Sequence, residues 1–136
     1  MKLFEVFLAA DNSGSRYLEL QVSARNVLFD AFFPAYRKGD EAVNFALESA
    51  VVLDGTLNRR KDEDWGWTVE LAVPWSEICG NTEVACPPEA GLQMRANVFR
   101  LEKADRKSQS GYALSPTRKP DFHAWNNAAV VELAPR

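Results

Sequence analysis

Alternation of apolar and polar residues is the dominant pattern along this chain. It is clearest in Trp67–Val73, where apolar side chains take every second position and Thr, Glu and Ala stand between them. This is the period of a β-strand with one buried face, and we predict a central strand here. Pro74 cannot donate to a sheet but suits the first position of a helix. Pro74–Ile78 is therefore predicted to be a single helical turn that leads the chain out of the sheet.

The same alternation recurs in shorter runs with turn residues between them. Leu3–Ala9 and Tyr17–Val22 flank the turn-forming Asp11–Gly14, which predicts a hairpin. Leu3–Ala9 is apolar on both faces, as interior strands are. Further strands are expected at 27–33, at 50–53, from Thr56, at 92–99 and at 129–133, with loops at 36–40, 81–90, 102–111 and 115–121. The short spacing leaves no room for βαβ crossovers. The predicted fold class is therefore all-β, an antiparallel two-sheet β-sandwich with one short helical turn after the central strand.

Composition narrows the class of protein further. The chain has 136 residues, the size of one domain, with 46% hydrophobic residues, 26% charged residues and a net charge of −3. It has no basic stripe to attract phosphates, so nucleic acid is not an expected partner. No apolar run approaches the roughly 20 residues that a membrane span needs. Glu5 interrupts the apolar start of the chain, which favours a strand over a signal peptide.

The titratable residues do not form a recognisable catalytic set. The one histidine, His123, has no Ser-His-Asp or Cys-His pattern around it. Glu5, Glu19 and Glu70 lie in predicted strands, and nothing marks a pair of them as the acid and nucleophile of a glycosidase. We therefore expect a binding protein without catalytic residues and rank a small glycoside hydrolase last.

Two cysteines, Cys79 and Cys86, lie close together in the sequence. They have no histidine nearby, so they do not fit a zinc pattern. Two free thiols and one disulfide that closes the loop between them both remain open.

Four tryptophans are many for a small sandwich. Trp67 and Trp75 are predicted to pack, whereas burial and exposure are equally open for Trp65 and Trp125. An exposed indole ring is a surface on which a sugar or an apolar partner can stack.

Polar side chains on the predicted strands form a second candidate set. They are Glu5, Gln21, Glu70, Arg95 and Asn97. Charged and amide groups of this kind form the bidentate hydrogen bonds that neighbouring sugar hydroxyls require, although an ordinary solvated sheet face has the same pattern.

Several short motifs, taken in order, resemble the family 9 carbohydrate-binding modules. They are Glu5–Leu8 with Tyr17–Val22, Trp67–Trp75, Gly91–Asn97 with Arg100, and Ser115–Thr117 with Phe122 and His123. The resemblance covers most of the chain and implies a β-sandwich that binds sugars, typically attached to or acting beside xylanases and other secreted glycoside hydrolases. The family pattern begins several strands earlier. Residues 1–136 are therefore expected to be a single module that is incomplete on its N-terminal side.

The resemblance also implies which residues bind sugar. The family's sugar-contacting glutamate falls on Glu5, and polar positions of two later strands fall on Gln21 and Arg95. In the family two tryptophans enclose the sugar, and the C-terminal one aligns with His123, two residues before Trp125. We expect these five residues to form the sugar-binding site.

The remaining expectations concern cofactors, partners and location. Some relatives hold calcium, but Ala9 and Ala10 stand where acidic residues are often found, so no metal or other cofactor is predicted. The expected ligand is a plant-type polysaccharide or oligosaccharide of the xylan or cellulose class, and the expected location is extracellular or in the cell envelope. The alternative is a structural or protein-interaction module without sugar binding. In it, the first strand and Trp65 would dock a second copy or another domain.

Overall fold

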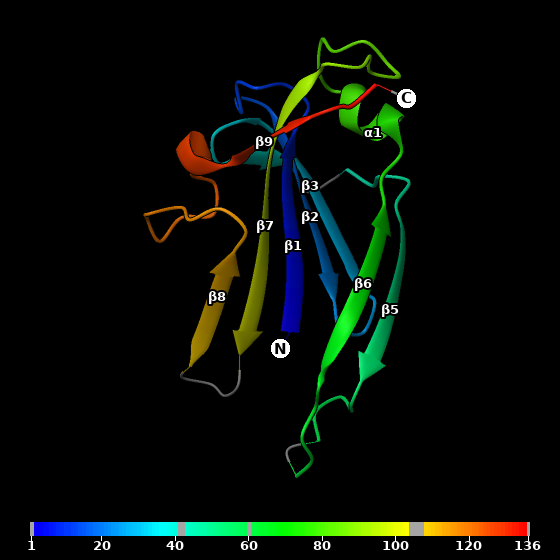
Figure 1. Cartoon of the computed structure of the whole chain (residues 1–136), viewed down its shortest axis with the longest axis vertical. Helices are drawn as coiled ribbons and strands as arrows, with labels where there is room; N and C mark the ends of the chain where they lie inside the picture. Colours follow the sequence, from blue (N-terminus) through cyan, green and yellow to red (C-terminus); the bar gives the residue numbers. More distant parts are fainter. Residues whose placement is uncertain (1, 41–42, 60, 104–107, 136) are drawn as a thin grey trace.

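The computed structural model describes residues 2–40, 43–59, 61–103 and 108–135. They form two antiparallel sheets and one short α-helical turn, which confirms the all-β fold class (Figure 1). The elements are β1 (Lys2–Ala9), β2 (Tyr17–Ser23), β3 (Leu28–Ala35), β4 (Lys38–Asp40), β5 (Glu48–Asp54), β6 (Gly66–Ala72), α1 (Trp75–Cys79), β7 (Gln93–Lys103), β8 (Gln109–Ala113), the 3₁₀ turn η1 (Trp125–Asn127) and β9 (Ala129–Glu132). The large sheet has the order β4-β3-β2-β1-β7-β8, with β9 also paired to β7, and the small sheet is the β5–β6 hairpin.

The first strand lies in the middle of the large sheet. β1 pairs with β2, where Phe4 lies opposite Val22, and with β7, where Phe4 lies opposite Arg100. The predicted hairpin and the interior character of the first strand are therefore confirmed. Since both edges of β1 are paired, β1 offers no free edge to a partner.

Several details differ from the sequence expectations. The strand predicted to be central, β6, pairs with β5 alone in the described part of the chain. No strand starts at Thr56, because its backbone N–H and its hydroxyl bind the Asp64 and Asp62 carboxylates at 2.7 Å each and hold it in the hairpin loop. The expected loop at 102–111 is also wrong at both ends, since β7 reaches Lys103 and β8 begins at Gln109, while 104–107 lie outside the described residues. Cross-strand pairing there outweighs the polar composition.

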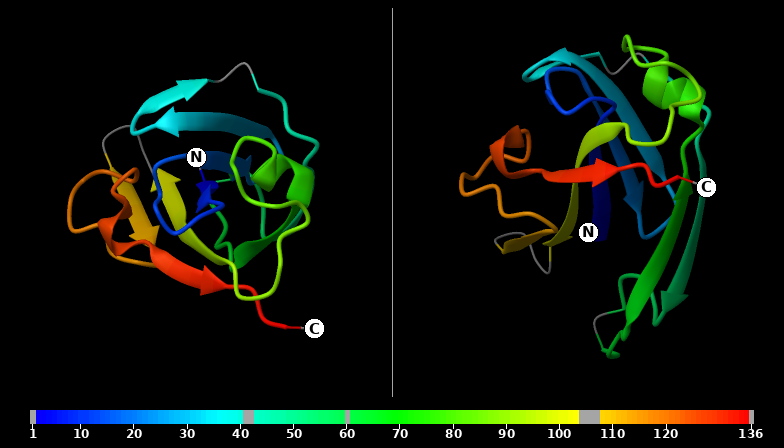
Figure 2. Two further views of the ribbon diagram at one scale, coloured as in Figure 1. Left: turned by 90° about the horizontal axis from the view of Figure 1, so that it is seen from above. Right: turned by 45° about the horizontal axis from the view of Figure 1, so that its top comes forward.

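The large sheet has two different faces. The face toward the small sheet, called here the sandwich face, packs Leu18 and Leu20 against Ile78 and Phe45. The opposite face, called the aromatic face, carries a cluster that includes Phe7, Tyr17, Phe99, Phe122 and Trp125. Segment 114–128 covers this aromatic face, so it and the green hairpin lie on opposite sides of the large sheet (Figure 2).

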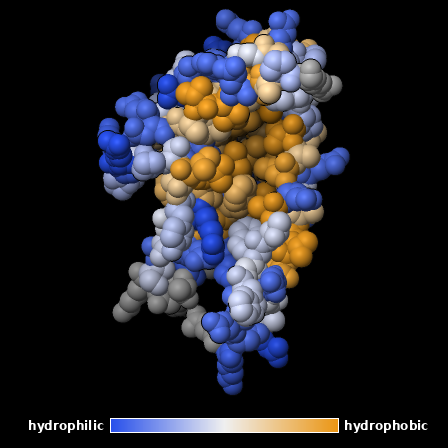
Figure 3. Space-filling model, in the orientation of Figure 1, coloured by the Kyte–Doolittle hydropathy of each residue, from blue (hydrophilic) through white to orange (hydrophobic). Residues whose placement is uncertain are grey.

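The small sheet covers only part of the sandwich face. On β1 the aromatic-face residues Phe7 and Ala9 are fully buried, whereas the sandwich-face residues Phe4, Val6 and Leu8 are half-buried. At the edge formed by β8 and β9, which the small sheet does not cover, apolar side chains are exposed to solvent. Figure 3 shows a broad hydrophobic region on this side of the molecule. In the described part of the chain we find no helix with the length and hydrophobicity of a membrane span.

Candidate functional site

All five residues predicted to bind sugar lie on the aromatic face or in the segment that covers it. Glu5, Gln21 and Arg95 project from β1, β2 and β7 on this face, since Glu5 pairs with Gln21, and Arg95 with Ala9. His123 and Trp125 belong to segment 114–128. The structure places Glu5 and Gln21 in a carboxylate group, His123 and Trp125 in a cluster around Tyr17, and Arg95 between the β1–β2 turn and segment 114–128.

The carboxylate group consists of Glu5, Gln21 and Glu19. The Gln21 amide nitrogen donates to one oxygen of Glu5 and to one oxygen of Glu19, both at 2.6 Å. Glu5 is 4% exposed, and its other oxygen, Oε2, is buried without a hydrogen-bond partner. Burial, followed by the charge of Glu19, raises the pKa of Glu5 to about 8. Near neutral pH, Glu5 is therefore mostly a neutral acid beside a carboxylate.

Glu19 was not among the predicted site residues. It precedes Gln21 by two positions in a strand, and this spacing places both on one face. The alternation of β2 therefore contained the signal, although the family resemblance did not point to it.

Arg95 acts as a structural tie. Its Nε donates to the backbone oxygen of Asn12 at 2.7 Å and to the Asn12 side-chain oxygen at 2.9 Å, and its Nη1 donates to the Trp125 carbonyl at 2.9 Å. It thereby joins the β1–β2 turn to segment 114–128. These contacts use much of the hydrogen-bonding capacity that was expected to face a ligand.

His123 and Trp125 meet at Tyr17. The Tyr17 hydroxyl accepts from the Arg37 backbone N–H at 3.1 Å and is hydrogen-bonded to His123 Nδ1 at 2.8 Å, in a direction that depends on the tautomer of the imidazole. Burial lowers the pKa of His123, which favours the neutral imidazole. The Trp125 ring packs against Phe7 and Tyr17 with centroids 6.4 and 5.0 Å away, and its Nε1 is buried without a partner. Trp125 is therefore a fixed wall and not a free stacking surface.

A cavity of about 480 Å³ opens beside this cluster. Its lining combines aromatic, amide and charged side chains: Tyr36, Thr117, Arg118, Lys119, Asp121, His123, Ala124, Trp125, Asn126 and Asn127. Tyr36 is 56% exposed, and its hydroxyl donates to Asp121, which also forms an ion pair with Arg37. Partial burial would raise the pKa of Asp121, but these hydrogen bonds together hold it below its usual range. Glu5 and Gln21 do not line this cavity, which we call the Tyr36 cavity.

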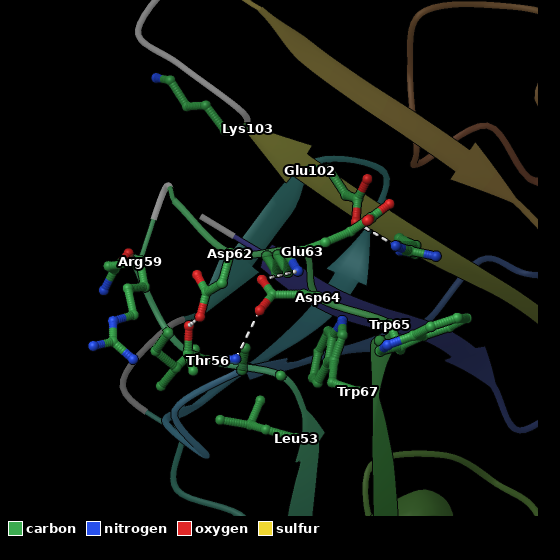
Figure 4. A pocket seen from close by; sticks show the side chains of 17 residues that line it. Leu53, Thr56, Arg59, Asp62, Glu63, Asp64, Trp65, Trp67, Glu102 and Lys103 are labelled. Carbon is green, nitrogen blue, oxygen red and sulfur yellow. Dashed lines mark hydrogen bonds and ion pairs between the residues drawn. The ribbon is translucent and has the colours of Figure 1, made fainter.

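A larger cavity of about 860 Å³ lies between the β5–β6 loop and the ends of β1 and β7 (Figure 4). We call it the Trp65 cavity, because Trp65 is 89% exposed at its rim and Trp67 lies beside it. Trp75, which was predicted to pack, is 37% exposed.

Both cysteines are free thiols in this structure, so the disulfide is not formed. Burial, with a smaller contribution from Cys86, raises the pKa of the Cys79 thiol to about 11. Among the described residues no group of three or more His, Cys, Asp or Glu side chains is arranged to hold a metal ion.

Comparisons with protein-family models, with curated proteins and with solved structures found no match for this chain.

Proposed function

We propose that this chain is a non-catalytic carbohydrate-binding β-sandwich that binds oligosaccharides of the xylan or cellulose class at the Tyr36 cavity. The observation that carries the proposal is the composition of this cavity, which joins two of the predicted residues, His123 and Trp125, to an exposed tyrosine ring. Sugar sites combine an apolar ring, which contacts the C–H face of the sugar, with a few polar groups that bind hydroxyls. By its resemblance to secreted modules, the protein would act outside the cell beside a glycoside hydrolase.

The cavity offers a role to each kind of side chain. Tyr36 supplies the exposed ring, and Trp125 supplies a wall that the aromatic cluster holds in place. Asp121, kept ionised by its hydrogen bonds, accepts from sugar hydroxyls, while the exposed Asn126 both donates and accepts. Each contact is weak, so the expected affinity is modest.

The carboxylate group has a supporting role in this proposal. The Glu5 side chain is buried, so it can contact a ligand only if the side chains around it move. Gln21 is half-buried and therefore partly accessible. Direct sugar contacts from both residues stay predictions. Glu5 and Glu19 also fit poorly as a glycosidase pair, because one amide nitrogen bridges them and leaves no space for a sugar between them.

Titration with linear xylo- and cello-oligosaccharides, followed by calorimetry, tests the proposal. Tyr36→Ala should weaken binding by about tenfold, the effect of losing about 1.4 kcal/mol of stacking. Tyr36→Phe keeps the ring and loses only the hydroxyl's bonds to Asp121 and Arg37, so it should retain most of the affinity. Tyr112→Ala is the matched control, since Tyr112 is 60% exposed on β8 and lies outside the cavity. A folded protein that binds none of these sugars would contradict the proposal, as would equal losses for Tyr36→Ala and Tyr112→Ala.

The uncovered part of the sandwich face favours a second candidate function, a protein-interaction module that pairs with a second copy of itself. Val131, opposite Met94 on β7, is 39% exposed, and Leu114, whose backbone N–H binds the Val98 carbonyl of β7 just after β8, is 68% exposed. In addition, one edge of β6 has no partner in the described residues. One copy thus carries both an open strand edge and an open apolar face, so two copies could cover each other reciprocally.

Light scattering coupled to size exclusion separates the two candidates. The interaction module would be favoured by a dimer that Leu114→Lys dissociates and Val52→Lys leaves intact. Val52 is the matched control because it is equally exposed, at 69%, but lies on the outer side of the hairpin. A monomer over the whole accessible concentration range would contradict it. The test substitution is placed on the sandwich face and not in β1, because both edges of β1 are already paired within the sheet.

A further inference from the structure

The β5–β6 loop, which lines the Trp65 cavity, lies well apart from segment 117–127, which lines the Tyr36 cavity (Figure 1). Its volume of about 860 Å³ is within the range of about 300–1,000 Å³ that is usual for small-molecule sites. The two cavities share no lining residue, so a ligand in one does not touch the other.

Two tryptophans form the apolar part of this cavity. Trp67 lies opposite Leu53 in the hairpin, and Trp65 precedes it by two positions, a spacing that places both side chains on the same side of an extended chain. Figure 4 shows both side chains among the residues that line the cavity, with the Trp65 ring extending away from the loop. The Trp65 backbone N–H donates to the Asp54 carbonyl at 2.9 Å, which fixes the residue to β5 although its ring is 89% exposed. A flat ring left open on a fixed backbone is suited to stacking.

The polar wall of the cavity is also held in place. Asp64 accepts from the Thr56 N–H at 2.7 Å and from Lys2 Nζ at 3.3 Å, which links the hairpin loop to β1. The Thr56 hydroxyl donates to Asp62 at 2.7 Å. At Gly55, with φ of +140°, a Cβ atom would collide with Asp64, so only glycine fits this close approach. These contacts hold Gly55, Thr56, Asp62 and Asp64 in place in the described part of the loop.

The charges of the lining indicate the class of ligand. Four described cationic residues and four anionic ones face the cavity: Lys2, Arg59, Arg100 and Lys103, and Asp62, Glu63, Asp64 and Glu102. Their formal charges cancel, and Arg100 and Glu102 form an ion pair. Among the described lining residues, a phosphate or a metal cation would meet as many like charges as opposite ones. A neutral ligand with many hydroxyl groups can use both kinds of side chain, because carboxylates accept and guanidinium and ammonium groups donate.

We propose that the Trp65 cavity is a second carbohydrate site, which takes a neutral oligosaccharide by stacking on Trp65 and Trp67 and by hydrogen bonds to the paired charges of the loop and of β7. This site goes beyond the function proposed for the Tyr36 cavity and does not depend on it.

Fluorine NMR of protein labelled with 5-fluorotryptophan tests this site separately from the first one. The four tryptophans give four resonances, which single Trp→Phe variants assign. Neutral xylo- or cello-oligosaccharides should shift the Trp65 and Trp67 resonances, and Trp65→Ala should weaken binding at this site by about tenfold or more. Val52→Ala, on the outer side of the same hairpin, should leave the affinity unchanged.

The outcomes distinguish the two proposals. If the Trp65 resonance stays fixed in the folded protein at all sugar concentrations, the second site is excluded, even where Trp125 responds. If Trp65 responds and Trp125 does not, the second site stands and the Tyr36 cavity fails as a sugar site. A response of Trp65 to acidic oligogalacturonides alone would overturn the assignment to a neutral ligand.

Discussion

Replacing Glu5 with glutamine should stabilise the protein at neutral and alkaline pH. Burial and the charge of Glu19 raise the pKa of Glu5 from 4.5 to about 8 in the folded state. As the pH rises through this window, the unfolded chain loses the proton first, so unfolding becomes more favourable. One pKa unit corresponds to about 1.4 kcal/mol, so the wild-type free energy of unfolding should fall by up to about 5 kcal/mol between pH 4.5 and pH 8.

Glutamine has the shape of the neutral acid and does not ionise. Its oxygen can accept from Gln21, as Glu5 Oε1 does at 2.6 Å, and its amide nitrogen takes the position of Glu5 Oε2, which has no hydrogen-bond partner. Glu5→Gln and the wild type should therefore be equally stable near pH 4.5, and the variant should be the more stable by several kcal/mol at pH 8.

Urea denaturation at a series of pH values measures this difference. The neutral His123, whose pKa is lowered in the folded state, makes stability fall as the pH decreases, but it does so equally in both proteins. The difference between the two proteins therefore isolates Glu5. Glu70→Gln, at an exposed position of β6, is the control and should follow the wild type. Parallel curves for Glu5→Gln and the wild type from pH 4.5 to 8 would refute the reasoning.

Two further predictions concern local packing and thiol chemistry. Gly14 and Gly91 both have positive φ, of +65° and +87°. A Cβ atom added at Gly14 would lie 2.9 Å from Trp125 Cγ, whereas a Cβ atom added at Gly91 would have no neighbour within 4 Å. Gly14→Ala should therefore cost about 1–3 kcal/mol more unfolding free energy than Gly91→Ala and should alter the Trp125 fluorescence, and equal losses would contradict this. Iodoacetamide at pH 8 should alkylate the exposed Cys86 and spare the buried Cys79, whose pKa is about 11. Mass spectrometry of the folded protein measures this, and equal labelling of both thiols would show that Cys79 is accessible.

The faces of the strands could be predicted from the sequence, but their neighbours could not. In β6 the alternation is as expected, since Trp67, Val69 and Leu71 are half-buried, while Thr68 and Glu70 are exposed. The same pattern gave no information on how many strands flank β6, because alternation reports what covers a face and not what pairs with an edge. The short β4 was missed for a related reason, since its pairing with β3 and not its own composition makes it a strand.

The candidate site was predictable where it follows strand parity. Glu5 and Gln21 are opposite each other on paired strands, as their shared face suggested. The contact between Tyr17 and His123 spans 106 positions and depends on how segment 114–128 folds over the sheet. Loop paths of this kind leave no periodic signal. Tyr36 was likewise assigned only to a polar loop, and its exposure beside His123 is visible in the structure alone.

Two polar residues of β7 explain how the Tyr36 cavity is positioned. Asn97, only 2% exposed, donates to the Ser115 carbonyl at 2.9 Å and accepts from the Ser115 N–H at 3.0 Å, which fixes the start of segment 114–128. Arg95, two positions earlier on the same face, holds the Trp125 carbonyl near the end of the segment. The sequence placed both in the polar candidate set and predicted Arg95 to bind sugar, because charged and amide groups can form hydrogen bonds with hydroxyls. Their bonds to backbone instead place His123 and Trp125, so ligand binding at the proposed Tyr36 cavity should depend on the segment between the two ties.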